Sequence, residues 1–208
     1  MKLYHYMDEY FGLQNLANQR IKASTFDRLN DPFELIGIET SDQDIRAALK
    51  EMKRRVASKF GILCFSKIWS NPVQWAHYAD NHKGLCIELE LADKDDARKV
   101  DYVSERLESK LIADPNFPQK LLLSKFKHWE YEQEYRLIRE LINFDKDNGI
   151  FFQPFNSDIK LTKIIIGCQS NITRHSLMKI LNEADRNVEI IYARAAFKSF
   201  KIVKHKNK

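Results

Sequence analysis

The sequence predicts a single domain of the α+β class, with a mixed, mostly antiparallel sheet and flanking helices. Segments with the pattern of strands outnumber those with the pattern of helices, and the two kinds do not alternate regularly, which disfavours a doubly wound parallel sheet. Of the 208 residues, 44% are hydrophobic and 30% are charged, so the chain can bury one substantial core. We expect this domain to span residues 1–197, followed at 198–208 by a basic tail that holds the last strand and a fraying end.

The first elements follow from alternation and from capping residues. Residues 2–6 alternate and are rich in aromatic rings, which predicts a strand. Asp8 is expected to cap a short helix, and a second strand follows at 20–24. Next, Asn30 and Asp31 favour turns, and Asp31 precedes a proline, so an ordered loop is predicted there.

A long helix and a short one are predicted in the following part. Residues 41–58 place apolar side chains at helical spacing and indicate a surface helix with a solvated basic face. After a strand at 61–66, Ser70 or Asn71 is expected to cap the second helix, which turns Trp75 toward the core. A strand, LCIELEL, then follows.

The remaining elements are shorter. Strands are expected at 99–103, 135–142, 150–155, 163–167, 188–194 and 200–203. Helices are expected near 105–112, near 118–127 and from Ser170 or Asn171, the last carrying Leu177, Ile180, Leu181 and Ala184.

One stretch, residues 128–136, is denser in chemically active side chains than any other. If its backbone is extended, Glu130, Glu132, Glu134 and Arg136 line one face at intervals of roughly 7 Å. The aromatic residues between them then point into a core. Because a row of like charges is costly without compensation, the stretch is a candidate site. If it is helical instead, Glu132 and Arg136 form an ordinary surface pair.

The charge of the chain is concentrated in its tail. Five lysines occur in the last eleven residues with no acid among them, and they account for the whole formal net charge of +5. The rest of the chain is therefore formally neutral, and a nucleic-acid partner is not supported.

Cysteine usage and hydropathy indicate a cytoplasmic protein. Cys64, Cys86 and Cys168 lie singly within apolar runs, without the paired spacing of metal sites or disulfides, which predicts buried free thiols. His77 and His82 likewise lack a cysteine or an acid at metal-binding spacing, so no metal is expected. No window approaches eighteen apolar residues, so we expect no membrane partner.

Three motifs in order resemble a known family. They are LNDPFE at 29–34, WAHYADNHKGLCIELE at 75–90 and WEYEQEYRLI at 129–138. Together they are similar to the signature of the bacterial domain-of-unknown-function family 2971. The members of that family are largely uncharacterised, so this resemblance implies no activity.

A more remote resemblance is to ADP-ribosyltransferase domains. These use an Arg or His on a first strand, a Ser/Thr-rich second strand and a later Glu, often in an ExE motif. The chain offers His5, then Ser24 and Thr25, then Glu132 and Glu134 in the same order. The resemblance implies an enzyme with NAD as co-substrate that transfers ADP-ribose to an unknown macromolecular acceptor, or that hydrolyses NAD as an NAD glycohydrolase. It also implies an effector of the toxin or anti-phage type.

The resemblance also implies roles for individual residues. Glu134 would stabilise the oxocarbenium-like transition state at the nicotinamide ribose, and Glu132 would orient or deprotonate the acceptor. The residues that would hold NAD are His5, Ser24, Tyr6, Trp75, Tyr78 and Arg136. His5 is equally well explained as a core histidine with its hydrogen bonds satisfied.

Two other functions compete with this one. In the first, a non-catalytic module binds a peptide or other ligand in a pocket shaped by LNDPFE and WAHYAD, with Asn30, Asp31, Glu34, His77 and His82 as candidate pocket residues. Asn30, Asp31 and Glu34 can also simply close a turn. The second is a metal-dependent nuclease that uses the carboxylates Asp31, Glu34, Glu132 and Glu134.

Overall fold

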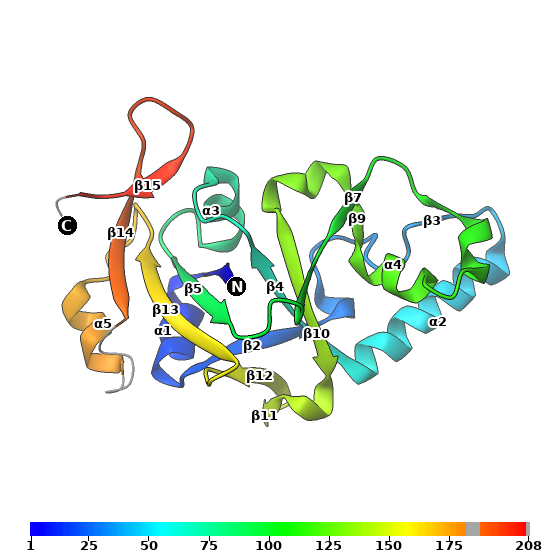
Figure 1. The fold of residues 1–208 in the computed structure, drawn as a ribbon, viewed down its shortest axis with the longest axis horizontal. Helices are drawn as coiled ribbons and strands as arrows, with labels where there is room; N and C mark the ends of the chain where they lie inside the picture. Colours follow the sequence, from blue (N-terminus) through cyan, green and yellow to red (C-terminus); the bar gives the residue numbers. More distant parts are fainter. Residues whose placement is uncertain (182–187, 207–208) are drawn as a thin grey trace. The chain divides into compact units, whose positions relative to one another are not determined.

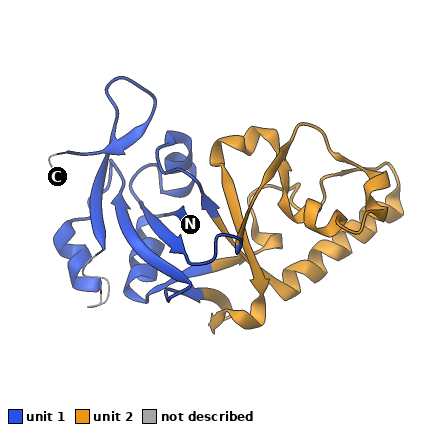
Figure 2. Ribbon diagram, viewed as in Figure 1, with its two compact units in different colours: residues 1–22, 65–96, 153–208 blue, residues 23–64, 97–152 orange. Residues whose placement is uncertain are grey.

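The chain divides into two compact units, each assembled from separate stretches of sequence (Figure 2). We analysed a computed structural model, which describes residues 1–181 and 188–206. Unit 1 comprises residues 1–22, 65–96 and 153–208, and unit 2 comprises residues 23–64 and 97–152. Three strands contain a boundary between the units: β2 (Arg20–Thr25), β4 (Phe60–Ser66) and β12 (Ile150–Pro154).

Unit 1 is built on a mixed sheet (Figure 1). The strand β5 (Leu85–Leu91) lies between β1 (Lys2–Met7) and β13 (Ile159–Ile166) and runs antiparallel to both. β14 (Glu189–Ala195) then pairs parallel with β13, and β15 (Ile202–Lys204) pairs antiparallel with β14. The helices of this unit are α1 (Glu9–Ala17), α3 (Pro72–Tyr78) and α5 (Arg174–Ile180).

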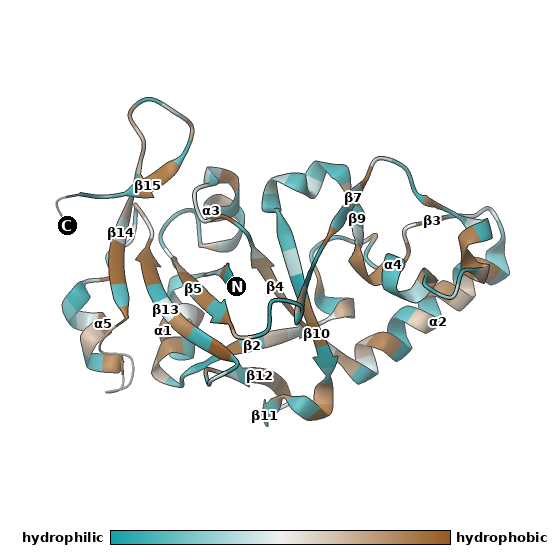
Figure 3. Ribbon diagram, in the orientation of Figure 1, coloured by the Kyte–Doolittle hydropathy of each residue, from teal (hydrophilic) through white to brown (hydrophobic). Residues whose placement is uncertain are grey.

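Apolar side chains concentrate on the strands of this sheet (Figure 3). The strand β13 contributes Ile164, Ile165 and Ile166, none of which is accessible to solvent. Trp75 of α3 packs into the same core with Tyr6 and Ile165. The burial of these side chains is what holds the short helix α3 against the sheet.

Unit 2 contains the long helix α2 (Gln43–Lys59) and shorter strands. β6 (Ala97–Lys99) pairs antiparallel with β10 (Glu134–Glu140), and β11 (Asp145–Asp147) with β12. β7 (Asp101–Val103) pairs parallel with β9 (Ser124–Phe126), and β3 (Ile38–Glu39) with β8 (Leu107–Glu108). The helical elements besides α2 are α4 (Phe117–Leu123), η1 (Phe26–Arg28), η2 (Ser109–Ala113), η3 (Lys127–Glu132) and η4 (Leu141–Asn143).

The structure confirms the α+β class and the mixed, mostly antiparallel sheet. The structure also confirms the predicted helix caps. Asp8 accepts a hydrogen bond from the amide of Phe11 at the start of α1, and Asn71 accepts one from the amide of Val73 at the start of α3. The boundaries of the predicted domain at 1–197 and its tail at 198–208 stay a prediction. Among the described residues, no helix combines the length and the apolar character needed to cross a membrane.

Several expected elements differ from those observed. The helix expected near 105–112 is a short strand and a 3₁₀ turn, and the one expected at 118–127 ends at Leu123. α5 begins after Thr173, whose side chain forms a capping box, rather than at Ser170 or Asn171. Ala184 of this predicted helix lies outside the described residues.

The three cysteines, which were all expected to be buried, differ in exposure. Cys86 is buried as expected and Cys64 is half-buried, but Cys168 is exposed, because it follows the end of β13.

The stretch 128–136 is not one extended segment. Residues up to Glu132 form the 3₁₀ helix η3, Gln133 takes a left-handed conformation (φ 46°), and only then does β10 begin. As a result Glu132, Glu134 and Arg136 are the buried side chains, whereas Trp129 and the neighbouring tyrosines are only half-buried. The expectation that the aromatic residues of an extended stretch point into a core is therefore wrong.

Candidate functional site

Arg136 is the centre of an ion cluster inside unit 2. It lies on β10 and is only 1% exposed. Its Nε donates to Glu134 Oε1 at 2.9 Å. Nη1 donates to Glu34 Oε2 and to the carbonyl oxygen of Leu122. Nη2 donates to Glu34 Oε1 and to Glu134 Oε2. These contacts use all five N–H donors of a guanidinium group. Arg136 is thus fully engaged by the protein itself.

Lys125 supplies the second cation of the cluster. It lies on β9, its side chain is largely buried, and its Nζ is 2.5 Å from Glu132 Oε2 and 3.0 Å from Glu134 Oε2. The ammonium group also lies 5.0 Å from the centre of the Trp129 ring. Because Glu132 ends η3 and Glu134 begins β10, the left-handed residue between them lets both carboxylates reach one lysine.

The cluster sets the protonation of its members. Burial alone would raise the pKa of Glu134, but Arg136 and Lys125 lower it to about 2. Burial likewise opposes the charge on Lys125, yet Glu134 and Glu132 raise the pKa of that amine above its usual range. For Glu34 burial prevails over the neighbouring Arg136, so the pKa of this carboxyl is raised. Lys125 is therefore a protonated amine at neutral pH, which makes it an ion-pair partner and not a nucleophile.

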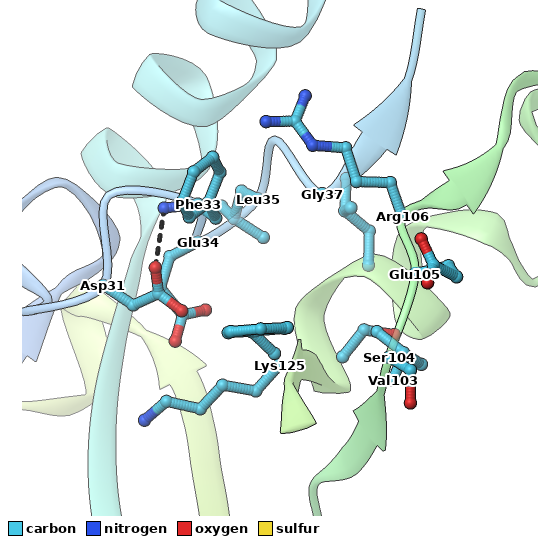
Figure 4. A pocket seen from close by; sticks show the side chains of 13 residues that line it. Asp31, Phe33, Glu34, Leu35, Gly37, Val103, Ser104, Glu105, Arg106 and Lys125 are labelled. Carbon is cyan, nitrogen blue, oxygen red and sulfur yellow. Dashed lines mark hydrogen bonds between the residues drawn. The ribbon is translucent and has the colours of Figure 1, made fainter. Parts of the chain in front are cut away.

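A cavity of about 240 Å³ lies beside the cluster, within unit 2 (Figure 4). Lys125 and Glu34 belong to its wall, so the ion cluster forms one side of it. Arg106, whose guanidinium carbon lies 4.9 Å from the centre of the Phe33 ring, contributes to another side. The wall also has large apolar side chains, from Phe33, Leu35, Val103, Leu121 and Phe126, and polar ones from Ser104, Glu105 and Ser124.

Asp31 is the buried carboxylate of this cavity that the described residues leave partly open, and the exposed Glu105 also belongs to the wall. Asp31 is 4% exposed, and its Oδ1 accepts the backbone amide of Phe33 at 2.9 Å, as an Asp before a turn commonly does. Its backbone carbonyl accepts the amide of Glu34. Within residues 1–181 and 188–206, Oδ2 of Asp31 has no hydrogen-bond partner, although Asp31 lines the cavity. Oδ2 is not one of the buried side-chain atoms that lack a partner, so it is accessible and can accept a hydrogen bond from water or from a ligand.

The other candidate residues of unit 2 lie apart from this arrangement. Ser24 is half-buried on β2, where it pairs with Ile62 of β4. Asn30 is exposed in the loop that leads to Asp31. Neither is part of the cavity wall.

The remaining candidates lie in unit 1, where three of them pack together. Trp75 makes an edge-to-face contact with Tyr6 (5.3 Å between ring centres) and stacks on His82 (6.5 Å). The Tyr6 hydroxyl donates to the carbonyl of Ile68, and the Trp75 indole donates to that of Trp69. Tyr6 and Trp75 therefore serve the core of unit 1 with their polar atoms satisfied.

His5, His77 and Tyr78 complete the predicted set. His5 lies on β1 opposite Ile87, with its ring 6.0 Å from that of Phe65. His77 is exposed on α3 and contacts the ring of Tyr78 edge to face. The roles assigned to these residues, and to Glu132 and Glu134 in catalysis, stay predictions.

Among the described residues, no group of three or more His, Cys, Asp or Glu side chains is placed to hold a metal ion.

Sequence reasoning missed part of the site. Lys125 gave no signal, because it stands in an unremarkable run (LLLSKFK) and reaches its partners only through the turn at Gln133. From the sequence, the segment from Val103 to Arg106 is expected only to hold the end of a strand and the start of a helix. Its place in the cavity follows from the pairing of β7 with β9, which no local pattern reveals.

Comparison with known proteins adds one finding. No curated protein and no solved structure matches the chain significantly. The model of a family described as "Protein of unknown function (DUF2971)" matches residues 74–137. This segment contains the whole of the second motif and nearly all of the third, and in unit 2 it supplies Lys125, Glu132, Glu134 and Arg136. Over residues 74–137 the chain is therefore similar to the DUF2971 family, as its second and third motifs predict.

Proposed function

We propose that the protein is a ligand-binding module whose cavity in unit 2 takes a small, partly apolar ligand bearing a positively charged hydrogen-bond donor. The observation that carries the proposal is Asp31: a largely buried carboxylate that lines a cavity and has one accessible oxygen to which none of the described residues donates. A charged donor is the partner that such an oxygen binds most strongly.

The state of the ion cluster supports binding over catalysis. Arg136 holds both oxygens of Glu34 and both of Glu134, and Lys125 holds Glu132 as well. A general base or nucleophile must instead have a free lone pair within reach of substrate. The cluster is best explained as the scaffold that fixes the LNDPFE loop, and with it Asp31, at the edge of the cavity.

The cavity also limits the ligand. Its volume of about 240 Å³ is below the range usual for drug-sized ligands, so a single ring or one amino-acid side chain fits. Its apolar wall favours a flat or aliphatic body. Amidines and primary amines on an aromatic ring are the simplest probes of this chemistry.

Ligand-detected NMR with three isosteric probes tests the proposal. Benzamidine should bind, whereas benzamide should bind more weakly and benzoate least, because only benzamidine pairs a cation with Asp31. Asp31→Asn keeps an oxygen for the Phe33 amide but removes the charge, and we expect it to weaken benzamidine binding by about tenfold or more. Asp27→Asn is the matched control, since Asp27 is exposed in the same segment. Equal binding of benzamidine by Asp31→Asn and by the unaltered protein would refute the proposal.

NAD-dependent ADP-ribosyl transfer to a macromolecule is the second candidate. The observation that favours it is the low pKa of Glu134, about 2, which keeps the carboxylate ionised as the stabilisation of an oxocarbenium-like transition state requires. Lys125 would have to release Glu132 and Glu134 when NAD binds.

Release of nicotinamide from NAD distinguishes this candidate from simple binding. The second candidate requires release by the unaltered protein and its loss in Glu134→Gln. Absence of release with several acceptor mixtures, together with retained benzamidine binding, would leave the binding function alone.

A further inference from the structure

The hairpin that joins β14 to β15 presents two phenylalanine rings to solvent. Phe197 is 90% exposed and Phe200 is 99% exposed. The strands pair antiparallel from Ala195 and Ile202 inward, and the amide of Ala196 donates to the carbonyl of Lys201 at 2.9 Å. Figure 1 shows the connecting loop reaching away from the sheet of unit 1. The rings are thus carried on a hydrogen-bonded hairpin and not on an unstructured end.

Two such rings at one tip differ from the scattered apolar side chains that most protein surfaces carry. Phe197 touches a cation, because the guanidinium carbon of Arg194 lies 4.4 Å from its ring centre. Phe200 belongs to neither of the two core clusters described for the units. Folding therefore gains little from either ring.

Cations flank both rings. Lys198 and Lys201 alternate with the phenylalanines, and the sequence from 190 to 208 contains no acid. Lys204 is engaged, since its Nζ lies 3.0 Å from Glu189 at the far end of β14. In the part of the chain that the structure describes, Lys198 and Lys201 form no ion pair. The tip therefore combines apolar rings with unneutralised positive charge.

We infer that this hairpin docks on an anionic lipid surface, with Phe197 and Phe200 entering the boundary between headgroups and acyl chains and Lys198 and Lys201 facing the headgroups. Apolar rings backed by cations are the combination that interfacial attachment uses. Single-stranded nucleic acid is disfavoured, because its binding proteins combine stacking rings with a basic groove that follows the backbone, whereas these rings stand on a projecting tip.

This inference lies outside the proposed function, since the hairpin belongs to unit 1 and none of its residues lines the cavity. It also differs from the expectation of no membrane partner. That expectation rested on the lack of long apolar segments, which bears only on segments that span a bilayer.

Flotation of the whole chain with lipid vesicles tests the inference. Vesicles of phosphatidylcholine with about 30% phosphatidylserine should bind the protein, more weakly as salt rises, and vesicles of phosphatidylcholine alone should not. The double variant Phe197→Ser/Phe200→Ser should lose about tenfold or more in binding, and Lys198→Gln/Lys201→Gln should lose the dependence on phosphatidylserine. Ile142→Ser, at another exposed apolar side chain, is the matched control and should bind as before.

The fluorescence of Phe197→Trp gives a second readout. Its emission should shift to shorter wavelength with vesicles that contain phosphatidylserine and stay unchanged with a single-stranded oligonucleotide. Failure of the unaltered protein to bind these vesicles, or equal binding by the double phenylalanine variant, would overturn the inference. A shift caused only by the oligonucleotide would overturn it in favour of a nucleic-acid site.

Discussion

Arg136 and Glu34 are 102 positions apart in the sequence, yet they form a two-pronged ion pair inside unit 2. The pair ties β10 to the loop that follows η1, and these two segments carry the third and the first of the family-like motifs. Asp31 is three residues before Glu34, so the position of its free oxygen depends on this pair. We therefore regard the pair as the link between the fold of unit 2 and the cavity.

Removing the arginine should destabilise the protein strongly. Arg136→Met leaves Glu34 and Glu134 buried without their main partner, and the loss of one member of a buried pair typically costs about 3–5 kcal/mol. Urea unfolding followed by circular dichroism measures this cost. Arg54→Met, which breaks an exposed pair with Glu51 on α2, should change stability little. A similarly small loss of unfolding free energy in both variants would show that the buried cluster stabilises the protein no more than an exposed ion pair does.

Stability should fall as the pH drops from about 5 to 2. Arg136 and Lys125 overcome the effect of burial and lower the pKa of Glu134 to about 2 in the folded state, whereas an unfolded Glu titrates near 4.3. Below pH 5 the unfolded chain therefore takes up a proton before the folded one does, so acid favours unfolding. Glu34, whose pKa is raised by burial, acts in the opposite direction.

Glu134→Gln isolates the contribution of this residue to the pH dependence. The free energy of unfolding of the variant should depend less steeply on pH between about 5 and 3, and the difference should approach one proton, or about 1.4 kcal/mol per pH unit, near pH 3. Urea titrations at several pH values give both slopes. Parallel slopes for the variant and the unaltered protein would mean that Glu134 is not held ionised by the cluster.

Filling the cavity should block ligand binding without unfolding the protein. Gly37 lines the cavity, and an added Cβ there would meet only the Phe33 carbonyl oxygen, at 4.0 Å. Gly37→Leu should therefore fold normally and bind benzamidine at least about tenfold more weakly, since its side chain occupies the space. Gly37→Ala should give an intermediate loss. Undiminished affinity in Gly37→Leu, with an unchanged melting temperature, would place the ligand elsewhere.

The sequence predicted elements that depend on neighbouring residues. The alternation of residues 2–6 and the caps at Asp8 and Asn71 were read correctly, because a strand pattern or a cap is set within a few positions. Asp31 and Glu34 are candidate pocket residues on the sequence alone, as parts of the LNDPFE motif, and both line the cavity. For the stretch 128–136 the sequence leaves an extended and a helical backbone open, and the structure combines the two, because nothing in the composition indicates the left-handed turn at Gln133.

Contacts between distant segments could not be predicted. Arg136 pairs with Glu34, and Lys125 pairs with Glu132 and Glu134. Neither set of ion pairs corresponds to a periodic pattern in the sequence. Depending on those contacts, the same carboxylates form a catalytic pair or a neutralised scaffold. For this reason Glu34, Glu132, Glu134 and Arg136 are candidates on the sequence alone, whereas Lys125 and the contacts among the five are not.

The most direct test of the account is a map of amide shifts in the ¹H–¹⁵N NMR spectrum as benzamidine is added. The amide of Phe33 reports on Asp31, because it donates to Oδ1 of that carboxylate, and Gly37 and Ser124 line the cavity. We predict that these three amides shift in the unaltered protein and in Asp27→Asn, and that they stay in place in Asp31→Asn. Shifts that persist in Asp31→Asn, or that occur only outside residues 31–37, 103–106 and 121–126, would contradict the account.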